Sequence, residues 1–210
     1  MKQLQELVGV DSGRSNALLF KGREEGNVMK DLGLLVLRLT MGGLLAGHGA
    51  QKLFGWFGGF GLKGTAGWVE SLGLKPGQLW ATAASLSEFG GGTLTALGLF
   101  HPLGPMATIG AMSMATAKAH WGKPIWASAG GAELPLTNIA TALGLALTGP
   151  GRYSLDRVFG IRLPRALVVM VAVAEVVMVV LGIMSRPTPA SPAENQASAT
   201  SEESQKAGSR

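Results

Sequence analysis

Five apolar stretches, separated by segments rich in glycine, proline or basic residues, divide the chain. They run from Leu32 to Gln51, Gln78 to Phe100, Gly104 to Ala119, Leu134 to Thr148 and Ala166 to Met184. A helix rises about 1.5 Å per residue, so the longer stretches can cross a hydrocarbon core of about 30 Å. No stretch has the two-residue alternation of a membrane barrel strand. The pattern predicts an all-α integral membrane four-helix bundle with an additional C-terminal transmembrane helix.

Polar segments lie at both ends of the chain. Residues 1–29 form a polar N-terminal arm without sustained periodicity, and we expect this arm to be disordered. Met29, directly before the first apolar stretch, is an alternative start of translation. The first 30 residues contain no apolar h-region, so we expect no cleavable signal peptide. Residues 185–210 are rich in Pro, Ser, Ala and Glu, which predicts a disordered tail.

Composition agrees with a membrane location. The chain is 47% hydrophobic and only 15% charged, which is unusual for a soluble protein. Its net charge of +5 comes from basic residues in the connecting segments, which indicates membrane topology rather than a nucleic-acid partner. The arm and residues 149–165 hold more Lys and Arg than the connections on the opposite face, so we expect a multi-pass protein of the cell membrane with a cytoplasmic N-terminus. The bias disappears if translation starts at Met29.

The chain contains no cysteine. This excludes disulfides, thiolate nucleophiles and cysteine-ligated iron–sulfur clusters. Any redox role therefore needs an electron carrier from elsewhere. Glycines are abundant, and Gly43 and Gly47, four residues apart, predict a seam where another helix approaches closely.

Polar residues interrupt the apolar stretches and gather near their ends. Antiparallel crossing of the first four stretches brings one group of them to the same membrane face: His48, Gln51, Lys52, Glu70, Lys118, His120 and Glu133. Arg38 and Glu88 lie deeper, and counting from the ends of the stretches predicts an ion pair between them. Ionisable groups inside the hydrocarbon are costly and are usually functional. Glu175, in the last stretch, has no obvious partner.

These residues suggest several kinds of chemistry. His48, Glu88, His120 and Glu133 are candidates for proton transfer at a catalytic site, since histidine titrates near neutral pH. The two histidines have the alternative of hydrogen-bonding to loops and headgroups. No His and Glu spacing supports a metal site, and none is predicted.

Further residues are candidates for cofactor binding. They are Trp56, Gln51 and Lys118, which the same face brings near the histidines. Lys118 has the alternative of extending its amine to the headgroups, and Trp56 that of anchoring the chain at the interface.

Several irregular motifs also occur in order along the chain. They are LRLTMGGLLAGHGAQKLFGWFGGFGLKGTAGWVESLGL (37–74), LSEFGGGTLTALGLFHPLG (86–104), KAHWGKPIWASAGGAELPL (118–136) and LTGPGRYSLD (147–156). With them, residues 30–156 closely resemble the DoxX family of small integral membrane proteins. The resemblance implies a four-span membrane domain over residues 30–156. Residues 157–184 then form a linker and a fifth transmembrane helix outside it.

The resemblance also implies a function. Some members of the family are associated with membrane-bound oxidoreductase complexes that act against oxidative stress, so we expect a quinone-linked membrane redox component. A quinone would lie among His48, Trp56, Glu88 and His120, and redox proteins would be its partners. The alternative is a non-catalytic membrane scaffold or assembly factor that recruits soluble redox or sulfur enzymes.

Overall fold

The computed structural model describes residues 2–185, with side chains from residue 26 onward. Over that range the chain is helical, with no strand. The α-helices are α1 (Lys2–Phe54), α2 (Gly61–Ser71), α3 (Gly77–Leu97), α4 (Leu103–Ala119), α5 (Glu133–Thr148), α6 (Leu155–Phe159) and α7 (Arg165–Met184). Two short 3₁₀ helices, η1 (Trp56–Gly58) and η2 (Ala127–Ala129), lie in the connections. The prediction of an all-α fold is confirmed for this part of the chain.

The predicted apolar stretches coincide with helices. The last four become α3, α4, α5 and α7, and the largest difference is at the end of α3, at Leu97 instead of Phe100. The first lies within α1, which already begins at Lys2, so the described part of the arm is helical rather than disordered. No proline precedes Pro76, and Leu, Lys, Gln and Glu in the arm favour helix. The predicted disordered tail, from residue 186, lies outside the described residues.

One described helix, Arg165–Met184, is long and apolar enough to cross a membrane by length and composition alone. The helices α4 and α5 have 17 and 16 residues, fewer than the roughly 20 of a typical crossing helix. The four-span membrane bundle therefore stays a prediction, whereas the helices expected to form it are present.

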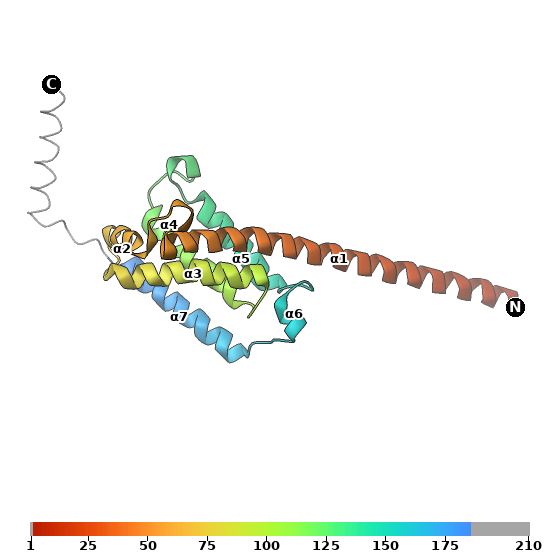
Figure 1. Ribbon diagram of the computed structural model, residues 1–210. Helices are drawn as coiled ribbons and strands as arrows, with labels where there is room; N and C mark the ends of the chain where they lie inside the picture. Colours follow the sequence, from red (N-terminus) through yellow and green to blue (C-terminus); the bar gives the residue numbers. More distant parts are fainter. Residues whose placement is uncertain (1, 186–210) are drawn as a thin grey trace, which may run out of the picture.

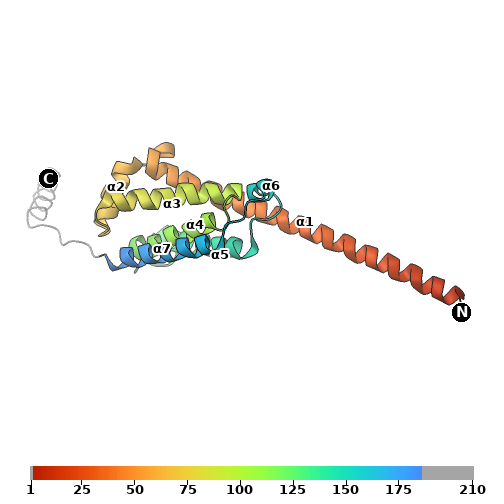
Figure 2. The same cartoon turned by 90° about the horizontal axis from the view of Figure 1, so that it is seen from below.

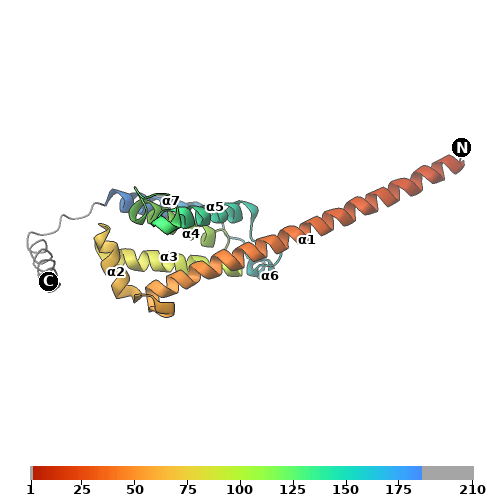
Figure 3. The ribbon, with the colours of Figure 1, turned by 90° about the horizontal axis from the view of Figure 1, so that it is seen from above.

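The helices form two layers. In Figure 3, α1, α2 and α3 make one layer, and α4, α5 and α7 make the other; Figure 2 shows the same division from below. The helix α4 connects the layers, because it packs on α3, α5 and α7. The helix α1 packs mainly on α3, and its N-terminal half extends beyond the bundle as a rod (Figure 1).

Glycines bring α1 and α3 into direct backbone contact. A Cβ atom at Gly92 of α3 would lie 2.5 Å from the backbone nitrogen of Ala46 and 2.6 Å from the carbonyl oxygen of Gly42. A Cβ at Gly49 of α1 would lie 2.2 Å from the backbone nitrogen of Phe89. Small residues permit this close approach of two helices. The contacts fix the antiparallel register of α1 and α3.

Arg38 connects three segments at the end of the bundle where α1 leaves it. Its guanidinium donates hydrogen bonds to the carbonyl oxygens of Thr95 (3.2 Å) and Ala96 (3.3 Å), in the last turn of α3. It also donates to the carbonyls of Pro150 and of Tyr153 (2.8 Å), in the connection between α5 and α6. A cation at a helix C-terminus satisfies carbonyls that lack partners within the helix. Arg38 is 3% exposed and thus holds α1, α3 and this connection together.

The glycine contacts give a first testable prediction. We expect Gly92→Ala to lower the stability of the protein by about 1 to 3 kcal/mol, because the added methyl group must push the backbones of α1 and α3 apart. The midpoint of thermal unfolding of the purified protein in detergent measures the effect. Gly90→Ala, in the same helix and with open space around its Cβ, is the matched control and should leave the midpoint unchanged or raise it slightly. Equal midpoints for the two variants would contradict the prediction.

Candidate functional site

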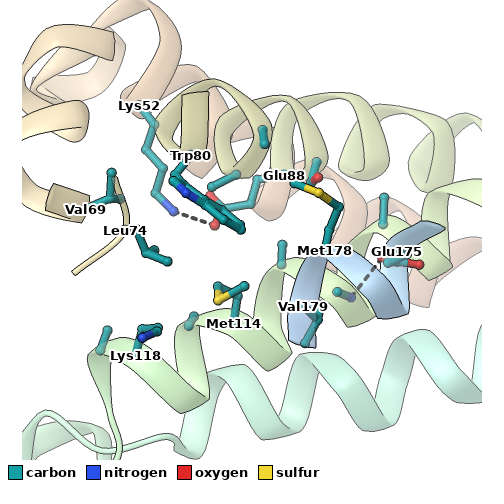
Figure 4. Close-up of a pocket in the computed structure, with 18 of the residues that line it drawn as sticks. Lys52, Val69, Leu74, Trp80, Glu88, Met114, Lys118, Glu175, Met178 and Val179 are labelled. Atoms are coloured by element: carbon teal, nitrogen blue, oxygen red, sulfur yellow. Dashed lines mark hydrogen bonds and ion pairs between the residues drawn. The ribbon is translucent and has the colours of Figure 1, made fainter. Parts of the chain in front are cut away.

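A cavity of about 340 Å³ lies between the two layers of helices. The helices α2, α3, α4 and α7 form its walls, and Lys52 near the end of α1 reaches it. Most of its lining is apolar, including Trp80, Met114 and Met178, which Figure 4 shows around the opening. Ligand sites in proteins are usually apolar hollows with a few well-placed polar groups. This cavity has that character.

The main polar group of the cavity is an ion pair. The Lys52 ammonium donates to Glu88 Oε1, which joins the end of α1 to the middle of α3 (Figure 4). The Lys52 side chain is 28% exposed and that of Glu88 only 4%. The second carboxylate oxygen, Oε2, is buried and accepts no hydrogen bond from a described residue. Buried polar atoms in proteins are nearly always hydrogen-bonded, so Oε2 has unused capacity beside the cavity.

Two more ionisable side chains line the cavity from α4 and α7. Glu175 of α7 accepts a hydrogen bond from the backbone nitrogen of Gly110 in α4, at 3.1 Å. A Cβ at Gly110 would meet this carboxylate at 2.1 Å, so only glycine permits the contact. The Lys118 ammonium donates to the carbonyl of Ser185, just after α7. The two contacts attach α7 to α4 at the middle and at the end of the helix.

The structure brings together only part of the predicted site. Glu88 and Lys118 line the cavity. His48 and Trp56 do not; His48 is exposed on α1, and Trp56 is 55% exposed beside Phe54, with ring centroids 4.8 Å apart. This cavity is therefore not lined by His48, Trp56 and His120, the residues expected from the sequence to surround a quinone.

The remaining predicted residues hold loops in place. His120 Nδ1 forms a hydrogen bond of 2.7 Å with the carbonyl of Gly130, and Glu133 accepts one of 2.8 Å from the backbone nitrogen of Ala127. The first bond lies within the connection between α4 and α5, and the second ties this connection to the first residue of α5. Gln51 donates to the carbonyl of Phe57, at 3.3 Å, in the connection after α1. His120, Glu133 and Gln51 therefore stabilise loops.

The predicted ion pair between Arg38 and Glu88 is not formed. Arg38 binds the carbonyls at the end of α3, and Glu88 pairs with Lys52. The register explains the difference, because Gly49 lies opposite Phe89, which puts Arg38 three helical turns from the level of Glu88, or about 16 Å. Counting from the ends of apolar stretches missed this offset, since α1 does not begin where its apolar stretch begins.

Sequence reasoning missed Trp80 and Met114 as cavity residues and left Glu175 without a partner. The small residues of α1 and α3 could have predicted the register of these two helices. Aligning Gly42 and Ala46 of α1 with Gly92 of α3 gives the observed register and brings Lys52 near Glu88. Nothing comparable in the sequence indicates that α7 packs on α4, because Glu175, the one acidic residue of α7, bonds to a backbone nitrogen of α4 and not to a charged side chain that the sequence would reveal.

Comparison with protein-family models matches residues 33–121 to DoxX. The match includes the motifs at 37–74 and 86–104 and ends within the motif at 118–136, and the resemblance to DoxX is thereby confirmed; the motif at 147–156 lies beyond the matched residues. Neither the comparison with curated proteins nor that with solved structures gave a match. The helix α7, with its cavity-lining residues, lies beyond the matched residues.

The ion pair gives a second testable prediction. We expect Lys52→Met to lower the free energy of unfolding by about 2 to 3 kcal/mol, because it leaves the buried Glu88 carboxyl without its cation. The double variant Lys52→Met/Glu88→Leu removes both charges and should recover much of this loss. Equilibrium unfolding in mixed micelles measures all three proteins. A double variant less stable than Lys52→Met would show that the unpaired Glu88 carboxyl is not the cause of the destabilisation.

Proposed function

Because the chain belongs to the DoxX family over residues 33–121, a family of membrane proteins, we propose that it is a multi-pass protein of the cell membrane that binds a quinone. The binding site is the cavity between α3, α4 and α7, and the protein is the quinone-binding component of a membrane redox system. The N-terminus lies in the cytoplasm. The observation that carries the proposal is the Lys52–Glu88 pair in the wall of an otherwise apolar cavity.

The chemistry of the cavity fits a quinone. A quinone combines an apolar ring and tail with two carbonyl oxygens that accept hydrogen bonds. Trp80, Met114 and Met178 supply apolar surface for the ring, and sulfur and aromatic groups adapt well to such ligands. The Lys52 and Lys118 ammonium groups supply donors, since each has three N–H bonds and donates one hydrogen bond within the described residues, Lys52 to Glu88 and Lys118 to the Ser185 carbonyl. The volume lies at the lower end of the range for small-molecule sites.

The ionisable residues suit a ligand that takes up protons. Reduction of a quinone to a quinol needs two electrons and two protons. Glu88 relays the two protons from solvent to the quinone one after the other, because its Oε2 lies unpartnered beside the cavity. Lys52 keeps the carboxylate oriented. With no cysteine in the chain, the electrons come from a partner oxidoreductase.

Quinone binding is a third testable prediction. Titration with a short-chain benzoquinone should quench the fluorescence of Trp68 and Trp80 in the full-length protein in detergent, because both tryptophans line the cavity. We expect Glu88→Gln and Lys52→Met each to weaken binding about tenfold, the equivalent of one charge-assisted hydrogen bond.

Matched controls separate this site from the one expected from sequence. Glu133→Gln removes a carboxylate outside the cavity, and His48→Ala removes the exposed histidine; both should bind the quinone like the wild type. Absence of saturable quenching in the wild-type protein would refute the proposal. Loss of binding in His48→Ala alone would move the site to the loop after α1.

The alternative function, a non-catalytic scaffold for redox or sulfur enzymes, has one observation in its favour. The helix α1 continues beyond the bundle and offers a helical surface away from the cavity (Figure 1). A fourth prediction follows for this case. Deletion of residues 2–25 should abolish co-purification of a defined redox enzyme, whereas Glu88→Gln should leave it intact. If co-purification of the redox enzyme were lost only in Glu88→Gln, recruitment through α1 would be excluded.

A further inference from the structure

A second hollow, separate from the quinone cavity, lies at the end of the bundle where α1 leaves it. Its volume is about 780 Å³. Residues of α1, of the connection between α5 and α6, of α6 and of the link to α7 line it. Figure 1 shows α6 beside α1 at this end of the molecule. The hollow shares no lining residue with the quinone cavity.

The lining of this hollow is basic. Four basic and two acidic side chains line it: Lys30, Arg152, Arg157 and Arg162, against Asp31 and Asp156. Burial lowers the pKa of His101, which also lines it, so this ring is neutral at pH 7 and adds no charge. The hollow therefore carries net positive charge from exposed lysine and arginine side chains.

Both carboxylates are already occupied by backbone groups. Asp156 accepts hydrogen bonds from the backbone nitrogens of Phe100 and His101, each at 2.8 Å. Asp31 accepts one from the backbone nitrogen of Arg152, at 3.1 Å. Among the described side chains the one salt bridge is that of Lys52 and Glu88. The four cations of the hollow thus have no carboxylate partner within the described residues, and their charge is available to an anion.

In the membrane orientation proposed above, on which this inference rests, the hollow lies at the level of the lipid headgroups. Several helices begin or end at this end of the bundle: α3 ends at Leu97, α4 begins at Leu103, α5 ends at Thr148 and α7 begins at Arg165. The apolar helix that is long enough to cross a membrane thus starts beside the hollow. Val158 and Phe159 of α6 are 71% and 67% exposed next to the basic residues. Exposed apolar side chains beside cations are typical of a surface that enters the headgroup region.

From these observations we propose that the hollow binds the headgroup of an anionic phospholipid. The guanidinium groups of Arg157 and Arg162 bind the phosphate, because the planar fork of arginine matches phosphate oxygens. Val158 and Phe159 contact the acyl chains, which a free phosphate ion does not have. In membrane proteins, basic pockets between helices on the cytoplasmic side bind the headgroups of anionic phospholipids.

The test uses the full-length protein, delipidated in detergent and titrated with phosphatidylglycerol or phosphatidylcholine under native mass spectrometry. We expect phosphatidylglycerol to bind the wild type clearly more tightly than phosphatidylcholine. The double variant Arg157→Gln/Arg162→Gln should lose about tenfold in affinity for phosphatidylglycerol, since each basic residue near an anionic surface contributes measurably. Added salt should weaken the binding of the wild type, which tests the charge without any substitution.

The matched control removes two exposed basic residues elsewhere, with Lys63→Gln/Lys123→Gln, and should bind like the wild type. Equal affinity of the wild type for the two lipids, or an equal loss in the control, would overturn the proposal. So would displacement of phosphatidylglycerol by millimolar inorganic phosphate, because the occupant would then be a free anion. Soluble glycerol phosphate should compete only weakly, since it lacks the acyl chains.

Discussion

Backbone contact between α1 and α3 is the constraint on which the rest of the structure depends. At Gly42, Gly49 and Gly92 the two helices lie so close that a single methyl group would collide with the opposite backbone. Such packing leaves no freedom to slide one helix along the other, because an interior packed at this density cannot absorb even one methylene group. The register that results decides which polar residues of α1 meet which parts of α3.

Because of that register, Arg38 and Lys52 have different kinds of partner, although both are cations on one helix. Arg38 meets the end of α3, where carbonyl groups lack helical partners, and its guanidinium donates four hydrogen bonds, all to backbone oxygens. Lys52 meets the middle of α3, where backbone carbonyls are already bonded, so its partner is a side chain, Glu88. The first contact is structural. The second leaves a carboxylate oxygen unpartnered beside a cavity, which is where chemistry is possible.

The helices could be predicted from the sequence because their apolar stretches are long and their ends are marked by Pro76, Pro102 and Pro164. Glu88 could be recognised as a site residue because a carboxyl in an apolar helix is costly. Its partner could not, since pairing depends on register, and register depends on backbone contacts that hydropathy does not record. The cavity itself could not be predicted, because one of its walls is α7, and Glu175 marks one side of α7 without indicating that its partner is a backbone nitrogen of α4.

The contacts of Arg38 also limit which substitutions this end of the bundle can accept. A Cβ at Gly98, the residue after α3, would lie 2.7 Å from both Arg38 Cζ and Ser154 Cβ, and Asp156 donates its backbone nitrogen to the Gly98 carbonyl at 3.0 Å. These residues share one set of contacts, so the cost of changing one depends on whether another has changed already. In evolutionary terms Arg38, Gly98, Ser154 and Asp156 form an epistatic unit. The effects of substitutions there on stability are therefore not additive, even though the residues are spread over more than half the length of the chain.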